Sequence, residues 1–177
     1  DFLLQQMDRE MDTRASIEAS QKEAARRDEE AALFVRLESQ HADVRTKAFG
    51  ELAAVAAQGD SRCIEAVLAG LADPGPEVRR AALATLPKVA VQGDARVRKA
   101  LLERLGHQDA ELRSVALDAL TLAAVKGDAG VVAKALEALE DAFAGVRAAA
   151  FRLLHTVAVK GDGAVVTALG ACLADPR

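Results

Sequence analysis

Apolar residues recur along this chain in two alternating helical patterns, and the whole arrangement returns every 34 residues. In its second occurrence, apolar side chains from Val78 to Val89 keep helical spacing, which predicts a first helix over about residues 76–91. A shorter apolar stripe from Val97 to Leu105 predicts a second helix. A helix of about 11 residues is too short to be stable alone, so each second helix must pack against its neighbours.

Four consecutive repeats share this pattern without an insertion or a deletion. The shared positions are a leucine at the repeat boundary (Leu37, Leu71, Leu105, Leu139, Leu173), an alanine (Ala48, Ala82, Ala116, Ala150), an arginine after an aliphatic residue (Arg45, Arg79, Arg113, Arg147) and the aspartate of a Gly-Asp pair (Asp60, Asp94, Asp128, Asp162). Stacking one unit in this way makes a repeat array, so the sequence predicts an all-α fold, an α-α superhelix of helix pairs.

Each repeat carries signals for where its helices end and begin. The segment Asp73-Pro74-Gly75-Pro76 predicts a turn, with Pro76 at the first position of the following helix. We expect Gly93 to end that helix in the left-handed conformation. We expect Asp94 to cap the next helix by accepting hydrogen bonds from its free amides.

The repeats set the predicted domain boundaries. Residues 1–36 lie outside the period and are expected to form an N-terminal helical extension or cap, with residues 31–35 covering the core of the first repeat. The array covers residues 37–177, as repeats 37–70, 71–104, 105–138 and 139–172 and the start of a fifth at residue 173. Because the chain begins without Met and ends where a repeat opens, we expect a fragment or subunit of a larger assembly.

Charge and cysteine usage narrow the classes of protein to which this chain can belong. The formal net charge is −4, whereas a general nucleic-acid binder needs a broad basic field. Cys63 stands where the other repeats have valine, which indicates a small core residue, and Cys172 lies three repeats away, too far for a disulfide. No apolar run has the ~18–20 residues of a membrane span. We expect an intracellular protein, soluble or peripheral to a complex, in the cytosol or in an organelle.

The motif Glu-Val-Arg-Arg-Ala-Ala-Leu at residues 77–83, set between an Asp-Pro turn and a second short helix, resembles the HEAT repeat. The tetratricopeptide repeat has the same length, but its Trp, Gly and Tyr positions have no counterpart here. By this resemblance, the chain is identified as an armadillo-like HEAT solenoid with short Ala-rich units. The resemblance also implies a structural ladder that holds the repeats together, with Arg45, Arg79, Arg113 and Arg147 paired to Asp60, Asp94, Asp128 and Asp162.

The sequence contains no recognisable catalytic, metal-binding or phosphate-binding motif. His41, His107 and His155 occupy different positions in their repeats, and their spacing is not that of metal ligands. The glycine-rich phosphate loop with its Gly-Lys-Ser/Thr ending is also missing from the sequence. We therefore expect no enzymatic activity, no cofactor and no bound metal.

Candidate partner-binding residues are those where one repeat departs from its sisters. Arg98 replaces an aliphatic residue, and Arg96, Lys99 and Arg104 lie on the same second helix, which in HEAT arrays typically lines the concave face. This basic patch suits an acidic partner segment or a lipid or nucleic-acid phosphate, and a solvated face is the alternative. Phe143 stands in a turn between repeats, as a partner anchor or as a plug over the neighbouring loop.

These features favour a non-enzymatic scaffold for protein–protein interactions. One alternative is a HEAT-type lyase or chaperone-like protein that acts on a pigment–protein pair, against which the scarcity of aromatic residues weighs. A less favoured alternative is a nucleic-acid-binding HEAT protein, which would need broad positive charge. The identity of the partner is not written in the repeat.

Overall fold

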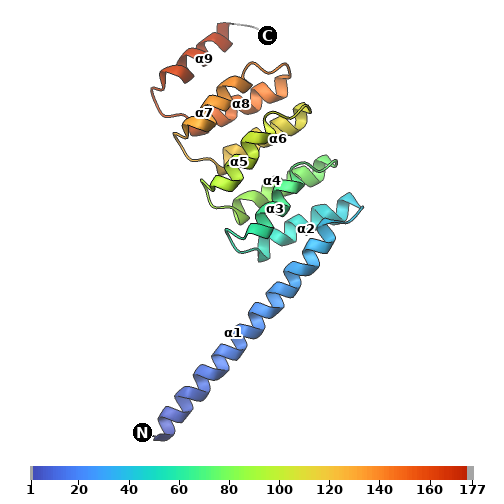
Figure 1. Ribbon diagram of the computed structural model, residues 1–177, viewed down its shortest axis with the longest axis vertical. Coiled ribbons are helices and arrows are strands. Elements are labelled where there is room, and N and C mark those ends of the chain that lie inside the picture. The colour runs from blue at the N-terminus through green and yellow to red at the C-terminus, as the bar shows by residue number, and fades with distance from the viewer. Residues whose placement is uncertain (1, 175–177) are drawn as a thin grey trace.

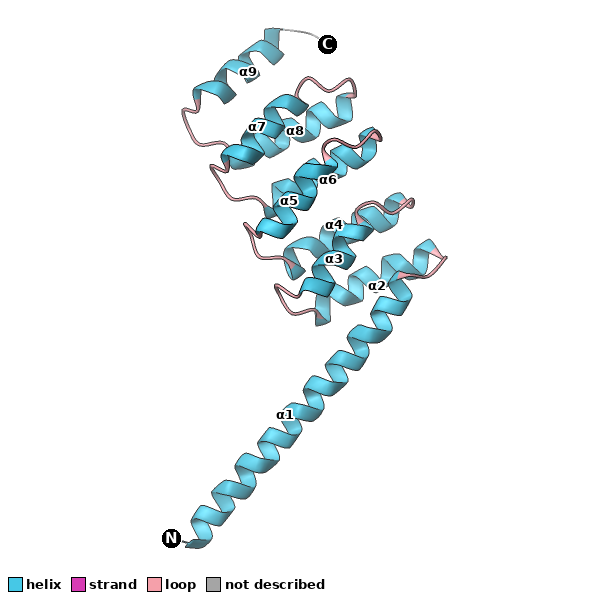
Figure 2. Ribbon diagram, viewed as in Figure 1, coloured by secondary structure: helices cyan, strands magenta, loops and turns pink. Residues whose placement is uncertain are grey.

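A computed structural model describes residues 2–174, and the side-chain surroundings of residues 13–14, 16–168 and 170. The described helices are α1 (Phe2–Leu37), α2 (Ala42–Val55), α3 (Ser61–Gly70), α4 (Pro76–Val89), α5 (Ala95–Arg104), α6 (Ala110–Ala123), α7 (Ala129–Ala138), α8 (Ala144–Val157) and α9 (Gly163–Ala174). Between residues 2 and 174 the chain forms helices and turns without any strand (Figure 2). The prediction of an all-α fold is confirmed.

The helices after α1 lie in two layers that run along the stack (Figure 1). One layer holds the first helix of each repeat (α2, α4, α6, α8), and the other holds the second helix (α3, α5, α7, α9). Within the first layer, α2 packs closely on α4 and α6 on α8, whereas the contact between α4 and α6 is smaller. The stack is the predicted α-α superhelix, with its loosest junction between repeats two and three.

The residues shared by all repeats form the core between the two layers. The repeated alanines and leucines are at most 1% exposed (Ala48, Ala82, Ala116, Ala150, Leu52, Leu86, Leu120, Leu154). Cys63 is buried among them, as predicted, and this burial raises the pKa of its thiol to about 12. The predicted core position of Cys63 is therefore confirmed, while the side chain of Cys172 lies outside the described residues.

The glycine of each Gly-Asp pair separates two helices in a way that differs from our prediction. Helix α4 ends at Val89 because Ala90 already adopts an extended conformation. Gly93 follows in the turn with a φ of 83°, and its amide donates to the carbonyl of Ala123 in the next repeat at 2.8 Å. The equivalent bonds join Gly59 to Val89 and Gly127 to Val157. The left-handed glycine thus links neighbouring repeats instead of ending the helix directly.

The aspartate of each pair caps the second helix, as predicted. The carboxylate of Asp94 accepts from the amides of Arg96 and Val97, two of the donors that the first turn of α5 leaves free. The other three aspartates accept from amides in the same way (Asp60, Asp128, Asp162). These side chains are therefore committed to the start of their own helix.

The predicted pairing of the arginine ladder is wrong. Arg45 binds Asp73, with Nε to Oδ2 at 2.7 Å and Nη2 to Oδ1 at 2.8 Å, and Arg113 binds Asp141 in the same two-point manner. None of the predicted pairs Arg45–Asp60, Arg79–Asp94 and Arg113–Asp128 forms, and Arg147 donates to the carbonyls of Asp141 and Ala142.

Helix length explains why the ladder uses a different aspartate. The arginine lies in the first turn of a first helix, whereas the Gly-Asp pair follows the far end of that helix. Fourteen residues of helix rise about 20 Å, which no arginine side chain spans. The turn after the second helix returns to the arginine's end of the stack, and there Asp73 and Asp141 lie. The ladder therefore joins Arg45 and Arg113 to the aspartate that follows the second helix, whereas Arg79 pairs with Glu111.

Helix α1 extends away from the stack, and its C-terminal end packs on α2 (Figure 1). Leu33 is 2% exposed, and the guanidinium of Arg62 lies 4.3 Å from the centre of the Phe34 ring. Val35, two positions after Leu33, points away from the array and is 73% exposed. The segment that covers the first repeat is therefore narrower than the predicted residues 31–35.

Candidate protein-interaction surface

The four candidate cations of repeat two all project from α5, in the layer of second helices. Lys99 is exposed and forms no ion pair or hydrogen bond with a described residue. Arg96 is also exposed, but its Nη2 lies 2.8 Å from the Oδ2 atom of Asp94. This hydrogen bond holds the pKa of Asp94 below its usual value and raises that of Arg96. Lys99 is thus the one cation of the four without a compensating partner among the described residues.

The other two cations join repeat two to its neighbours. Arg98 is half-buried and pairs with Asp128 in repeat three, with Nη1 to Oδ2 at 3.1 Å. Arg104 is half-buried too, and its Nη2 donates to the carbonyl of Leu68 in repeat one at 3.0 Å. The replacement of an aliphatic residue by Arg98 therefore has a structural role of its own, a contact between repeats.

Phe143 lies in the turn before α8, at the N-cap position of that helix. Its amide donates to the Oδ1 atom of Asp141 at 2.9 Å, and the guanidinium of Arg113 lies 5.7 Å from its ring centre. The ring is 57% exposed, so it does not act as a buried plug over the neighbouring loop. A ring that is exposed yet fixed by its turn fits the role of a partner anchor.

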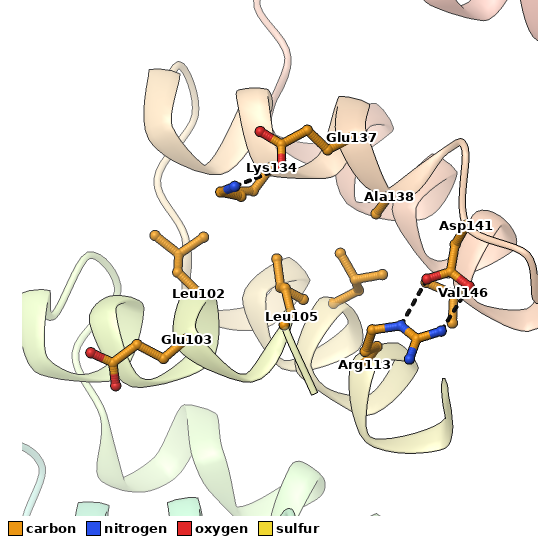
Figure 3. A pocket seen from close by; sticks show the side chains of 11 residues that line it. Leu102, Glu103, Leu105, Arg113, Lys134, Glu137, Ala138, Asp141 and Val146 are labelled. Carbon is orange, nitrogen blue, oxygen red and sulfur yellow. Dashed lines mark hydrogen bonds and ion pairs between the residues drawn. The ribbon is translucent and has the colours of Figure 1, made fainter. Parts of the chain in front are cut away.

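A cavity of about 390 Å³ lies between repeats two and three, bounded by α5, α6 and α7 (Figure 3). Leu102 and Leu105 line one side, and Lys134 and Ala138 of α7 face them across the opening. The ion pair of Arg113 with Asp141 closes one end, and the pairing lowers the pKa of Asp141 below its usual value.

Among the residues whose side chains are described, no three His, Cys, Asp or Glu side chains gather in a way that could hold a metal ion. His107 has a local role, because its Nδ1 atom accepts from the amide of Asp109 at 3.0 Å. None of the described helices is both long and apolar enough to cross a membrane.

Comparison with known proteins adds the family. The family model of HEAT repeats matches residues 30–121, just over half of the chain. The chain belongs to the HEAT-repeat family. HEAT repeats generally mediate contacts between proteins, and they are typically non-enzymatic. The matched region ends within α6, but the same HEAT geometry continues through α7, α8 and α9. No curated protein matches the sequence.

Two features of this HEAT array were missed by sequence reasoning. The carboxylates of the ladder, Asp73 and Asp141, recur two repeats apart, and Asp175, which lies outside the described residues, continues the series. That spacing was a usable signal, although His107 interrupts it. The cavity was missed because it depends on which side chains face one another across the stack.

Proposed function

We propose that this HEAT array is a non-enzymatic scaffold of a multi-subunit assembly, and that it binds protein partners through exposed side chains that differ between repeats. Phe143 carries the proposal. The sister positions hold His41, Gly75 and Asp109, so a large aromatic ring is found in one repeat alone. Its exposure of 57% and its hydrogen-bonded turn present an apolar surface in a fixed position, a feature of residues that dominate binding energy at interfaces.

The exposed cations of α5 supply the second proposed contact, with an acidic segment of the partner. Lys99 and Arg96 face solvent, whereas Arg98 binds a group of repeat three and Arg104 a group of repeat one. The ammonium group of Lys99 is available to a partner, since no described carboxylate pairs with it. A salt-sensitive contact at this surface would steer association and select acidic partners.

Amine-reactive crosslinking of the native complex, followed by mass spectrometry, tests the proposal. Lys99 on α5 and Lys134 on α7 are exposed in the layer of second helices, and Lys47 on α2 and Lys88 on α4 are exposed in the other layer. We expect crosslinks to a partner chain at Lys99 and Lys134. The second pair provides the matched control. Crosslinks confined to Lys47 and Lys88, or confined to the chain itself, would contradict the proposed surface.

A further inference from the structure

The cavity between repeats two and three lies where neither of two lining residues is as large as the phenylalanine or arginine found at the same positions in earlier repeats. Leu117 of α6 and Ala138 of α7 both line it. One repeat earlier the corresponding residues are Leu83 and Arg104, and two repeats earlier they are Phe49 and Gly70. Phe49 fills the space beside Gly70, where a Cβ atom would lie only 2.3 Å from the Phe49 ring. Each earlier pair contains a phenylalanine or an arginine, whereas the pair Leu117 and Ala138 contains neither.

Arg104 shows what fits the space. One repeat before the cavity, its guanidinium donates to the carbonyl of Leu68 at 3.0 Å and to that of Ala100 at 2.9 Å. One repeat later, the residues equivalent to Leu68 and Ala100 are Leu102 and Lys134, and both line the cavity. The residue equivalent to Arg104 itself is Ala138, whose side chain ends at Cβ. The cavity is therefore lined by the counterparts of the groups that bind an arginine side chain in repeat two.

The charge of the lining favours a cation. Arg113 pairs with Asp141, and Lys134 pairs with Glu137 at 2.6 Å. Glu103 also lines the cavity and forms no ion pair with a described residue, which leaves the lining with one negative charge. The carboxylate of Glu103 is exposed at the outer edge of the cavity and points away from both ion pairs and from the space between α5 and α7 (Figure 3). Leucine side chains complete the lining and suit the aliphatic stem of an arginine.

We infer that this cavity receives an arginine side chain of a protein partner, in the place that Arg104 fills one repeat earlier. The guanidinium would donate to the carbonyl of Leu102 and lie within the field of Glu103 and Glu137, with its stem against the leucines. The inference rests on the proposed function in one respect, that the arginine comes from a bound protein. It adds a pocket for a basic residue of the partner, next to the surface proposed to bind an acidic segment of the partner.

A titration of the whole chain with a small arginine probe tests the site without the partner. N-acetyl-arginine methylamide is added while the methyl resonances of Leu102, Leu105, Leu117 and Val146 are followed by NMR. We expect shifts at these methyl groups and none at Leu52 or Leu154, which are buried in repeats one and four. N-acetyl-citrulline methylamide has the same shape without the charge, and we expect it to cause no saturable shift. Equal binding of the two probes would overturn the inference.

Two substitutions fill the cavity from within, in the ways that the earlier repeats use. Ala138→Arg copies repeat two, and Leu117→Phe copies the aromatic residue of repeat one. We expect either variant that retains wild-type far-UV circular dichroism to lose binding of the arginine probe. Retained binding in a folded variant would overturn the inference. If both variants misfold, the comparison of the arginine and citrulline probes on the wild-type chain tests the inference instead.

Lys134→Ala distinguishes a cation site from an anion site. Repeat two has alanine at the equivalent position 100, where the arginine is already accommodated. Removal of this like charge should tighten binding of the arginine probe by about two- to fivefold, the size of one exposed charge interaction. Weaker binding, or binding of acetate that the substitution abolishes, would show an anion site instead. A failed titration combined with partner crosslinks at Lys99 would overturn the cavity inference and leave the proposed scaffold intact.

Discussion

Arg113 on α6 and Asp141 before α8 are 28 residues apart in sequence and form a two-point ion pair that joins repeat three to repeat four. The distances are 2.7 Å from Nε to Oδ2 and 2.9 Å from Nη2 to Oδ1. The two side chains are 14% and 13% exposed. Their geometry and burial set this pair apart from the exposed ion pairs of α1, since bidentate pairs are the stronger kind.

A double-mutant cycle should show that Arg113 and Asp141 stabilise the array as a pair. We expect Arg113→Ala and Asp141→Asn to be non-additive, because each removes the same interaction. The free energy of unfolding is obtained from urea denaturation followed by circular dichroism. The matched control is the cycle for Arg79 and Asp94. This pair was predicted from the family resemblance but does not form, so its two substitutions should be additive. Additivity for the first pair, or coupling in the control, would contradict the observed ladder.

His107→Asp should restore the missing carboxylate of the ladder and raise the melting temperature. His107 occupies the position equivalent to Asp73 and Asp141, and its Nδ1 atom already accepts an amide as their carboxylates do. Arg79 pairs instead with Glu111, whose side chain is 61% exposed. A carboxylate at position 107 would offer Arg79 the two-point partner that Arg45 and Arg113 have. An unchanged or lower melting temperature by scanning calorimetry would argue against this reading of the junction.

The repeat period could be predicted from the sequence, but the partners of the arginines could not. The Gly-Asp carboxylates and the carboxylates after the second helices share the same step of 34 residues, so periodicity does not choose between them. The choice is made by the length of the first helix, which places Asp60 and Asp94 at the opposite end from Arg45 and Arg79. The resemblance to HEAT repeats also pointed to the aspartates of the Gly-Asp pairs.

The cavity and the exposure of Phe143 were beyond prediction for a different physical reason. Leu117 and Ala138 lie on different helices, and helical spacing within one segment does not reveal that they face the same space. Phe143 stands in a turn, where periodicity gives no direction for the side chain. Caps and core positions were predictable because they depend on neighbours a few residues away, as with Asp94 and Cys63.

Stability should fall in acid because several aspartates have lowered pKa values. The hydrogen bonds from Arg113 lower that of Asp141, and the amide of Cys63 lowers that of Asp60. A carboxyl with a lower pKa in the folded state stabilises it above the unfolded value of about 3.9, and this stabilisation is lost as the pH falls through the folded value. We expect a constant free energy of unfolding from about pH 7 to 5 and a decline below about pH 4.

Urea denaturation at a series of pH values measures this dependence. Asp141→Asn should lower stability near neutral pH and reduce the steepness of the acid decline, because its titration no longer contributes. A variant whose decline matches that of the wild type would show that other groups control acid unfolding.

Gly127→Ala should destabilise the array by about 1–2 kcal/mol, because an L-residue with a side chain resists the left-handed conformation. Gly127 has a φ of 82°, and a Cβ atom there would lie 3.2 Å from the Cγ2 atom of Val159. Gly50→Ala is the matched control, since Gly50 is within α2 and a Cβ atom there meets open space. The control should gain about 0.5–1 kcal/mol from lower chain entropy in the unfolded state. Equal effects by urea denaturation would contradict the role given to the turn glycine.

The central claim is that an otherwise repetitive stack binds its partner through a few exposed side chains outside the pattern. The most direct measurement is the affinity of the Phe143→Ala variant for the partner identified by crosslinking. The matched control is Phe151→Ala, because the two rings have similar exposures of 57% and 52%. Phe143→Ala should reduce the affinity for the partner by about tenfold or more, as at an interface residue that dominates binding. Phe151→Ala should retain it. Undiminished binding by a folded Phe143→Ala variant would contradict the claim.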